Sequence, residues 1–310
     1  MTGIIRNLLK KISSESPPDT VPTPESVEPA PATPPPGEEP TLPMARIAPD
    51  SLDLPQLIVG CGQSVGKQRE HNEDALFALT TNLVSDSTQL PFGLYIIADG
   101  MGGHMHGEIA SGISVRAMAN YIIRKLYLPL INSSNIAMDT TVQEIMQQGV
   151  FEAHRSILKE AIGGGTTLTA ALIMGNQLSL THVGDSRAYL IHKDGSMEVI
   201  TQDHTLVKRL EELGQITPEE AAIHPQRNVL YRALGQGEPF EPDFGIFPIP
   251  ASGYLLLCSD GLWGVISDKE IHHIVTHSPT PHQACQRLID SSNAAGGPDN
   301  ITVILVRMPD

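Results

Sequence analysis

The stretch LYIIADGMGG, residues 94–103, joins an apolar run to a carboxylate, Asp99, and then to a loop in which three of four residues are glycine. A short apolar run rich in β-branched and aromatic residues is typical of a buried strand. Asp99 then stands at the tip of that strand, and Gly100 lets the backbone bend so that its carbonyl faces the same point. The stretch therefore predicts a strand that delivers two oxygen donors to one place.

Other apolar runs carry carboxylates in the same way. Residues 178–183 end at Gly184-Asp185, and residues 254–259 end at Asp260-Gly261. Two further runs start after a carboxylate: 75–79 follows Glu73-Asp74, and 301–306 follows Asp299-Asn300. In an antiparallel sheet the end of one strand lies beside the start of its neighbour, so these side chains can converge. We name the expected assembly the carboxylate rim: Glu73, Asp74, Asp99, Asp185, Asp260 and Asp299.

Crowded carboxylates repel one another unless a cation lies between them. Since the rim offers hard oxygen ligands without paired histidine or cysteine, it favours Mg²⁺ or Mn²⁺ over zinc. Arg69, five residues before Asp74, can reach a phosphate as a bidentate donor. Together these groups suit hydrolysis of a phosphate ester, in which two cations polarise the phosphoryl oxygens and supply a hydroxide nucleophile.

The composition limits the alternatives. The formal net charge of −15 over 310 residues argues against a nucleic-acid binder, which needs a basic face. The three cysteines form no CxxC pair and are expected to be small reduced thiols. No segment reaches the roughly 18 apolar residues of a membrane span.

The N-terminal 50 residues differ from the rest of the chain. Residues 13–50 hold 12 of the 25 prolines and seven acidic residues against one basic residue, Arg46. Such a segment cannot bury a core, and we expect a disordered acidic linker. Residues 1–12 are basic and amphipathic and could contact a membrane surface weakly, although a frayed tail is the simpler expectation. The folded domain is expected over residues 51–310.

Within that domain we expect an α+β fold. Helical periodicity marks residues 108–127, 140–162, 269–276 and 281–294, and Ser267 or Asp268 is expected to cap the third of these helices. Helices come in pairs between groups of strands, which favours antiparallel sheets covered by helix pairs. Asp194-Gly195 signals a hairpin turn. Residues 203–235 read as an irregular helical insert over a sheet edge.

Taken in order, the motifs resemble those of the metal-dependent serine/threonine protein phosphatases of the type 2C (PPM) family, in their compact bacterial form. The resemblance spans about residues 57–308. It is carried by GKQREHNED (66–74), DGMGGH (99–104), GTT (165–167), GDSR (184–187), SDGLW (259–263) and GPDN (297–300). It implies two stacked antiparallel sheets flanked by helix pairs, a four-layer αββα sandwich, with a flap at about residues 205–232.

The resemblance also implies residue roles. Asp99 would bridge two metal ions, the Gly100 carbonyl would bind one of them, and Asp260 and Asp299 would hold the other. Glu73 and Asp74 would act on metal-bound waters or in the shell around them. Arg69 would bind the substrate phosphate, and Asp185 with Asp260 would form the additional, third metal site of bacterial members.

One position departs from eukaryotic members, which carry a histidine two residues after the bridging aspartate. Here that residue is Met101, as is usual in bacterial members. The leaving group would then take its proton from a metal-bound water or need no dedicated acid. The nearby His104 and His106 are expected to serve the entry into the following helix.

Competing sites fail on spacing. None of the three cysteines is followed six residues later by arginine, as a cysteine phosphatase requires. Gly66-Lys67 lacks the surrounding residues of a nucleotide phosphate loop. Two alternatives stay open: a phosphatase of a sigma-factor partner-switch protein, and a phosphoprotein-binding module without catalysis. The first usually carries sensor domains, and the second should have lost a rim carboxylate.

The resulting hypothesis is a cytoplasmic, monomeric phosphatase that reverses a bacterial serine/threonine kinase. Its partners would be phosphorylated proteins, including the cognate kinase and its substrates. Its cofactors would be two Mn²⁺ or Mg²⁺ ions, with a third in the additional site.

Overall fold

The computed structural model describes residues 56–85, 88–102, 105–132, 140–237 and 240–309. The expected linker and the amphipathic N-terminus therefore lie outside the described residues, as does His104. Residues 55–310 form one compact unit. Among the described helices, none combines the length and hydropathy that a bilayer crossing requires.

Two antiparallel sheets form the centre of this unit. The first has the order β1-β11-β10-β7-β8, with β1 Ile58–Ser64, β7 Arg187–Ile191, β8 Met197–Val199, β10 Tyr254–Cys258 and β11 Ile301–Arg307. The second has the order β2-β3-β5-β6-β9, with β2 Asp74–Ser85, β3 Thr88–Met101, β5 Leu168–Met174, β6 Gln177–Val183 and β9 Asp243–Pro248. The short β4, Gly165–Thr166, pairs with the end of β3.

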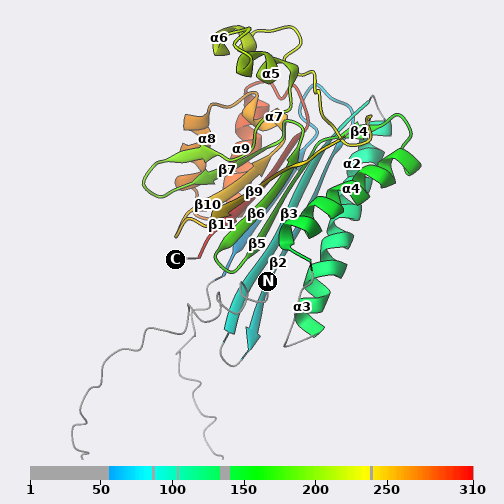
Figure 1. The fold of residues 1–310 in the computed structure, drawn as a ribbon. Coiled ribbons are helices and arrows are strands. Elements are labelled where there is room, and N and C mark those ends of the chain that lie inside the picture. Colours follow the sequence, from blue (N-terminus) through cyan, green and yellow to red (C-terminus); the bar gives the residue numbers. More distant parts are fainter. Residues whose placement is uncertain (1–55, 86–87, 103–104, 133–139, 238–239, 310) are drawn as a thin grey trace, which may run out of the picture. The chain divides into compact units, whose positions relative to one another are not determined.

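Helices cover the outer face of each sheet (Figure 1). The second sheet is covered by α2 Met105–Ile122 and α4 Val142–Glu160, with a π-helical turn, η1 Ile123–Tyr127, and α3 Leu128–Asn132 after α2. The first sheet is covered by α8 Asp268–Thr276 and α9 Pro281–Ala294. The expected α+β fold of two antiparallel sheets with flanking helix pairs is confirmed.

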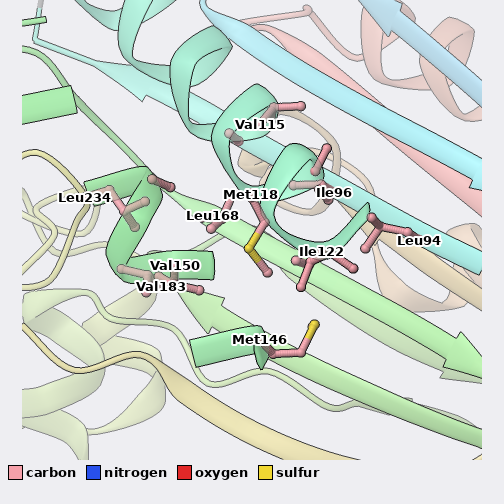
Figure 2. Packing of buried hydrophobic residues seen from close by; sticks show 14 of the residues in the cluster. Leu94, Ile96, Val115, Met118, Ile122, Met146, Val150, Leu168, Val183 and Leu234 are labelled. Atoms are coloured by element: carbon pink, nitrogen blue, oxygen red, sulfur yellow. The ribbon is translucent and has the colours of Figure 1, made fainter. Parts of the chain in front are cut away.

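The apolar runs of the sequence reflect strands that are buried on both faces. In β3, Leu94, Ile96 and Ala98 pack toward α2 and α4, while Tyr95 and Ile97 point into the space between the sheets. The strand β11 alternates in the same way between the α8–α9 side and the space between the sheets. Figure 2 shows the helix side of β3, where Leu94 and Ile96 meet Met118 and Ile122 of α2.

Local signals explain the helix starts. Ser267 caps α8 by accepting a hydrogen bond from the Glu270 amide, as the sequence predicted. Thr141 and Glu144 form a capping box at α4. Between β8 and β9, α5 Leu206–Glu212 and α6 Pro218–Ala222 occupy the segment expected to form the flap. The four-residue α7, Asp260–Trp263, follows β10 directly.

Candidate functional site

A pocket of about 640 Å³ lies where the tips of the two sheets meet. Asp99 and Gly100 reach it from the end of β3, and Asp185 from the β6–β7 connection between the sheets. Asp260 enters from the start of α7, and Asp299 from the residue pair before β11. Five of the six rim residues line this pocket: Glu73, Asp99, Asp185, Asp260 and Asp299.

Asp74 is the rim residue behind the pocket wall. It is the first residue of β2 and pairs directly with Asp99 of β3. Its side chain is only 8% exposed, and its Oδ2 accepts a hydrogen bond of 2.9 Å from the Ser259 hydroxyl. The carboxylate is therefore held in one orientation beneath Asp99.

Backbone contacts fix the β3 tip. The Gly100 amide donates to the Glu73 carbonyl over 3.1 Å, and the Asp99 amide donates to the Thr167 hydroxyl over 2.9 Å. A side chain at residue 100 would run into the Gly107 carbonyl and lie 2.5 Å from the Glu73 carbonyl. Glycine is therefore required at this position by the close approach of α2 and of the chain before β2.

The rim is electrostatically strained without a cation. Burial raises the pKa of Asp99 well above its usual range, and the charges of Asp74 and Asp260 add to the rise. Burial likewise raises the pKa of Asp74, of Asp185 and of Asp260, with neighbouring carboxylates contributing in each case. Ionised carboxylates in this arrangement repel one another. Burial weakens the screening of this repulsion by water, and a bound cation would offset it.

The donor set fits a hard divalent cation. Oδ1 of Asp74 and Oδ1 of Asp260 are buried and have no hydrogen-bond partner. Over the described residues, no three His, Cys, Asp or Glu side chains are already arranged as a metal site, so the carboxylates would have to turn toward a bound ion. A bound ion would therefore complete its shell with backbone oxygen and water, which is how Mg²⁺ is usually held.

Arg69 is the cation that contacts the rim. Its Nη2 lies 2.6 Å from Oδ2 of Asp299, and the Arg69 side chain is 50% exposed. A half-exposed ion pair of this kind contributes little to stability. Arg69 can consequently leave Asp299 for a phosphate group at small energetic cost.

Several residues of the site were not singled out by the sequence. Asn300 braces the loop before β2, since its Nδ2 donates to the carbonyls of Val65 and His71 and its Oδ1 accepts from the Glu73 amide. Thr167 holds Asp99, and Asn228 and Leu230 of the flap line the pocket. Asn300 and Thr167 lie inside quoted motifs, but bracing of this kind depends on distant backbone and leaves no spacing signal.

Two other expectations concern nearby residues. His106 lies exposed in the first turn of α2 and does not line the pocket, which agrees with a role in helix entry. Met101 does line the pocket. All three cysteines are free, with Cys258 and Cys285 buried and Cys61 half-buried.

Comparison with known proteins gives one consistent result. The family model described as Protein phosphatase 2C matches residues 60–228. The serine/threonine phosphatase stp of Listeria innocua is 36% identical over 241 residues, which cover 78% of this chain and 92% of that protein.

Solved structures agree in fold. The serine/threonine phosphatase PstP/Ppp of Mycobacterium tuberculosis superposes with a TM-score of 0.68 at 33% identity, covering 82% of this chain and all of that chain. A structure of the PstP catalytic domain in complex with two manganese ions superposes with a TM-score of 0.66 at 33% identity, covering 82% of this chain and 99% of that chain.

Proposed function

The chain belongs to the protein phosphatase 2C family and is a protein serine/threonine phosphatase, and we propose a role for each residue of its site. The family is metal-dependent, and the PstP relative binds two manganese ions. The observation that carries the proposal is the convergence of five of the six rim carboxylates on one pocket. Asp260, which lines the pocket, and Asp74, which lies behind its wall, each keep an unpartnered buried oxygen.

We propose that two Mn²⁺ or Mg²⁺ ions occupy the rim. Asp99 would contact both, the Gly100 carbonyl would bind one, and Asp260 with Asp299 would hold the other. Glu73 and Asp74 would support this shell from the β2 side, and Asp185 with Asp260 would offer a third site. When bound, the ions supply Lewis-acid polarisation of the phosphoryl group and a water nucleophile at neutral pH.

The chain's own groups bind and orient the substrate. Arg69, released from Asp299, would donate two hydrogen bonds to the phosphate and fix it over Asp99. The uncharged Met101 beside the pocket offers no proton, so the leaving alkoxide would take its proton from water. Asn228 and Leu230 of the flap would contact the substrate segment around the phosphorylated residue.

The finer assignment of substrates rests on the relatives. We propose that the chain removes phosphate from proteins phosphorylated by a bacterial serine/threonine kinase, including the kinase itself. A phosphatase of a sigma-factor partner-switch protein is the second candidate. Comparing kcat/KM on phosphorylated kinase substrates with kcat/KM on a phosphorylated partner-switch protein would separate the two candidates. We further propose a cytoplasmic monomer, in keeping with three free cysteines.

The experiment is hydrolysis of p-nitrophenyl phosphate and of a phosphothreonine peptide, each with Mn²⁺, with Mg²⁺ and with EDTA, beside Asp99→Asn. Activity that requires the metal and disappears in Asp99→Asn supports the proposal. A folded wild type that binds metal but hydrolyses neither substrate would identify a phosphoprotein-binding module instead.

A further inference from the structure

A buried histidine outside the pocket holds the turn that carries Asp185. His204 lies between β8 and α5 and is 1% exposed. Its amide donates to the Gly184 carbonyl over 2.7 Å, and the Gly184 amide donates to its Nδ1 over 3.1 Å. Both backbone groups of the residue before Asp185 are thus bonded to this one histidine.

The backbone conformation and close packing of Gly184 exclude any other residue from this position. Its φ is +109°, and an added side chain would lie 2.5 Å from Cγ2 of Thr167. The turn is therefore a glycine-only conformation wedged against the residue that holds Asp99. A small displacement of Gly184 would move Asp185 relative to Asp99.

The ring of His204 is itself held by the charged pair Asp243 and Arg232. Because Nδ1 accepts from Gly184, Nε2 is assigned the ring proton and donates to Oδ2 of Asp243 over 3.1 Å, with Nη1 of Arg232 3.2 Å from the same nitrogen. Asp243, the first residue of β9, accepts at Oδ1 from Nη1 of Arg232 over 2.8 Å. This chain of hydrogen bonds runs from Arg232 of the flap through Asp243 of β9 to the turn before Asp185.

The backbone of His204 also holds the pocket side of the flap. Its carbonyl accepts from the Tyr231 amide over 3.0 Å, and the next residue, Thr205, bridges to Leu230. Leu230 lines the pocket. His204 therefore contacts both the turn of Asp185 and the end of the flap.

We propose that His204 is a positioning residue for the phosphatase reaction: it sets the place of Asp185 through Gly184, and the Asp243–Arg232 pair sets the orientation of its ring. The inference rests on the proposed function only in taking Asp185 as a metal-site residue.

The chain contains its own reporter for this turn. Trp263 is the only tryptophan, and its Nε1 donates to the Asp185 carbonyl over 3.0 Å. The guanidinium of Arg187 lies 3.6 Å above the Trp263 ring and is tied to Asp203. Displacement of the Asp185 turn must therefore alter the fluorescence of Trp263, even in EDTA.

Two substitutions separate the two hydrogen bonds of the imidazole, one with the Gly184 amide and one with Asp243. In His204→Asn the amide oxygen stands near the place of Nδ1 and can accept from Gly184, but the side chain is too short to reach Asp243. In His204→Gln the amide nitrogen can reach Asp243, but the acceptor for Gly184 is lost. Arg232→Gln removes the outer pair, and Arg209→Gln is the matched control, a flap arginine paired with Glu212.

We expect His204→Gln to shift the Trp263 emission in EDTA and to raise the Mn²⁺ concentration for half-maximal activity about 10-fold, the usual cost of losing support behind a metal ligand. His204→Asn and Arg232→Gln should each shift it in the same direction by less, and Arg209→Gln should not shift it. Unchanged emission in a folded His204→Gln, or identical behaviour of the Asn and Gln variants, overturns the proposal.

Two controls keep the test decisive. If His204→Gln fails to fold, Arg232→Gln carries the test, because Arg232 and Asp243 are partly exposed, and unchanged Trp263 emission there rejects the proposal. If the wild type shows no metal-dependent activity, the proposed function fails, while the emission in EDTA still decides whether His204 positions the turn.

Discussion

At the scale of single residues, the site is a compromise between burial and charge. Asp74 pairs with Asp99 across two strands that both belong to the hydrophobic sandwich, so two carboxylates meet where burial raises the pKa of each. Such an arrangement costs free energy in the metal-free chain. A divalent cation bound at the rim, as we propose, would relieve this repulsion and so gain binding free energy.

Arg69 provides the first prediction. Because its side chain is half-exposed, Arg69→Met should change the free energy of unfolding by less than about 0.5 kcal/mol. It should lower kcat/KM for a phosphothreonine peptide about 10- to 100-fold, the value of a charge-assisted bidentate contact.

Arg155→Met is the matched control for Arg69, since Arg155 pairs with Glu152 on α4 and does not line the pocket. Steady-state kinetics and urea unfolding of both variants make the comparison. Equal losses of kcat/KM in the two variants would contradict a phosphate-binding role.

His182 provides a prediction about pH. Burial, assisted by His204, lowers the pKa of His182 to about 4, whereas an unfolded histidine titrates near 6.5. The folded chain then binds fewer protons than the unfolded chain, so this stabilisation is complete above pH 6.5 and is lost as the pH falls toward 4. The loss amounts to about 3 kcal/mol at pH 4.

Urea unfolding of wild type and His182→Gln in EDTA between pH 7 and pH 4 checks this. The rim carboxylates, whose raised pKa values act in the opposite direction, are present in both chains, so the difference between the two curves isolates the histidine. We expect the wild type to lose more stability on acidification than the variant. Parallel curves would show that His182 is not kept neutral by the fold.

At the scale of elements, close contact between helices explains part of the sequence. Gly149 of α4 faces Met118 of α2, and an added Cβ would lie 2.6 Å from the Met118 sulfur. Figure 2 shows Met118 between the α2 and α4 residues of this core. Gly112, also in a helix, would meet only the mobile end of Arg116 at 3.2 Å.

The two glycines therefore predict opposite results. Gly112→Ala should stabilise the chain by about 0.5–1 kcal/mol, because alanine is the better helix former. Gly149→Ala should destabilise it by about 1–2 kcal/mol, since overpacking exceeds the gain in propensity. Urea unfolding decides, and equal stabilisation by both substitutions would mean that α4 does not approach α2 as closely as described.

The elements also show what sequence reasoning can reach. The range predicted for α9, residues 281–294, agrees with the structure, because Thr280 caps the helix and Pro281 starts it. The strands predicted over 75–79 and 94–98 extend to β2 and β3, since hairpin pairing satisfies backbone groups beyond the apolar runs. β8 and β9 were not predicted, because a three-residue strand and an edge strand with alternating exposure carry no apolar run.

At the site, the structure brings together carboxylates that the sequence singled out, whereas the residues that brace them were not predicted. Asp99, Asp185 and Asp260 stand at strand ends, and strand ends are visible as the limits of apolar runs. Asn300 and His204 act through contacts with residues far away in the sequence. Those contacts exist only after the sheets have packed, so no local pattern encodes them.

At the scale of the whole molecule, the pocket formed by the described residues lies within the folded unit. Every residue that lines the pocket belongs to residues 68–300. We predict that a chain lacking residues 1–50 hydrolyses p-nitrophenyl phosphate at the wild-type rate, since the acidic, proline-rich segment cannot bury a core. Kinetics on the truncated and full chains test this, and a large loss of turnover would make the segment part of the catalytic unit.

We propose above all that the carboxylate rim binds two divalent cations through Asp99. Calorimetric titration of Mn²⁺ into metal-free wild type, Asp99→Asn and Asp185→Asn tests it most directly. We predict two tightly bound ions in the wild type, two in Asp185→Asn, and loss of tight binding in Asp99→Asn. Two tightly bound ions in a folded Asp99→Asn would contradict the account.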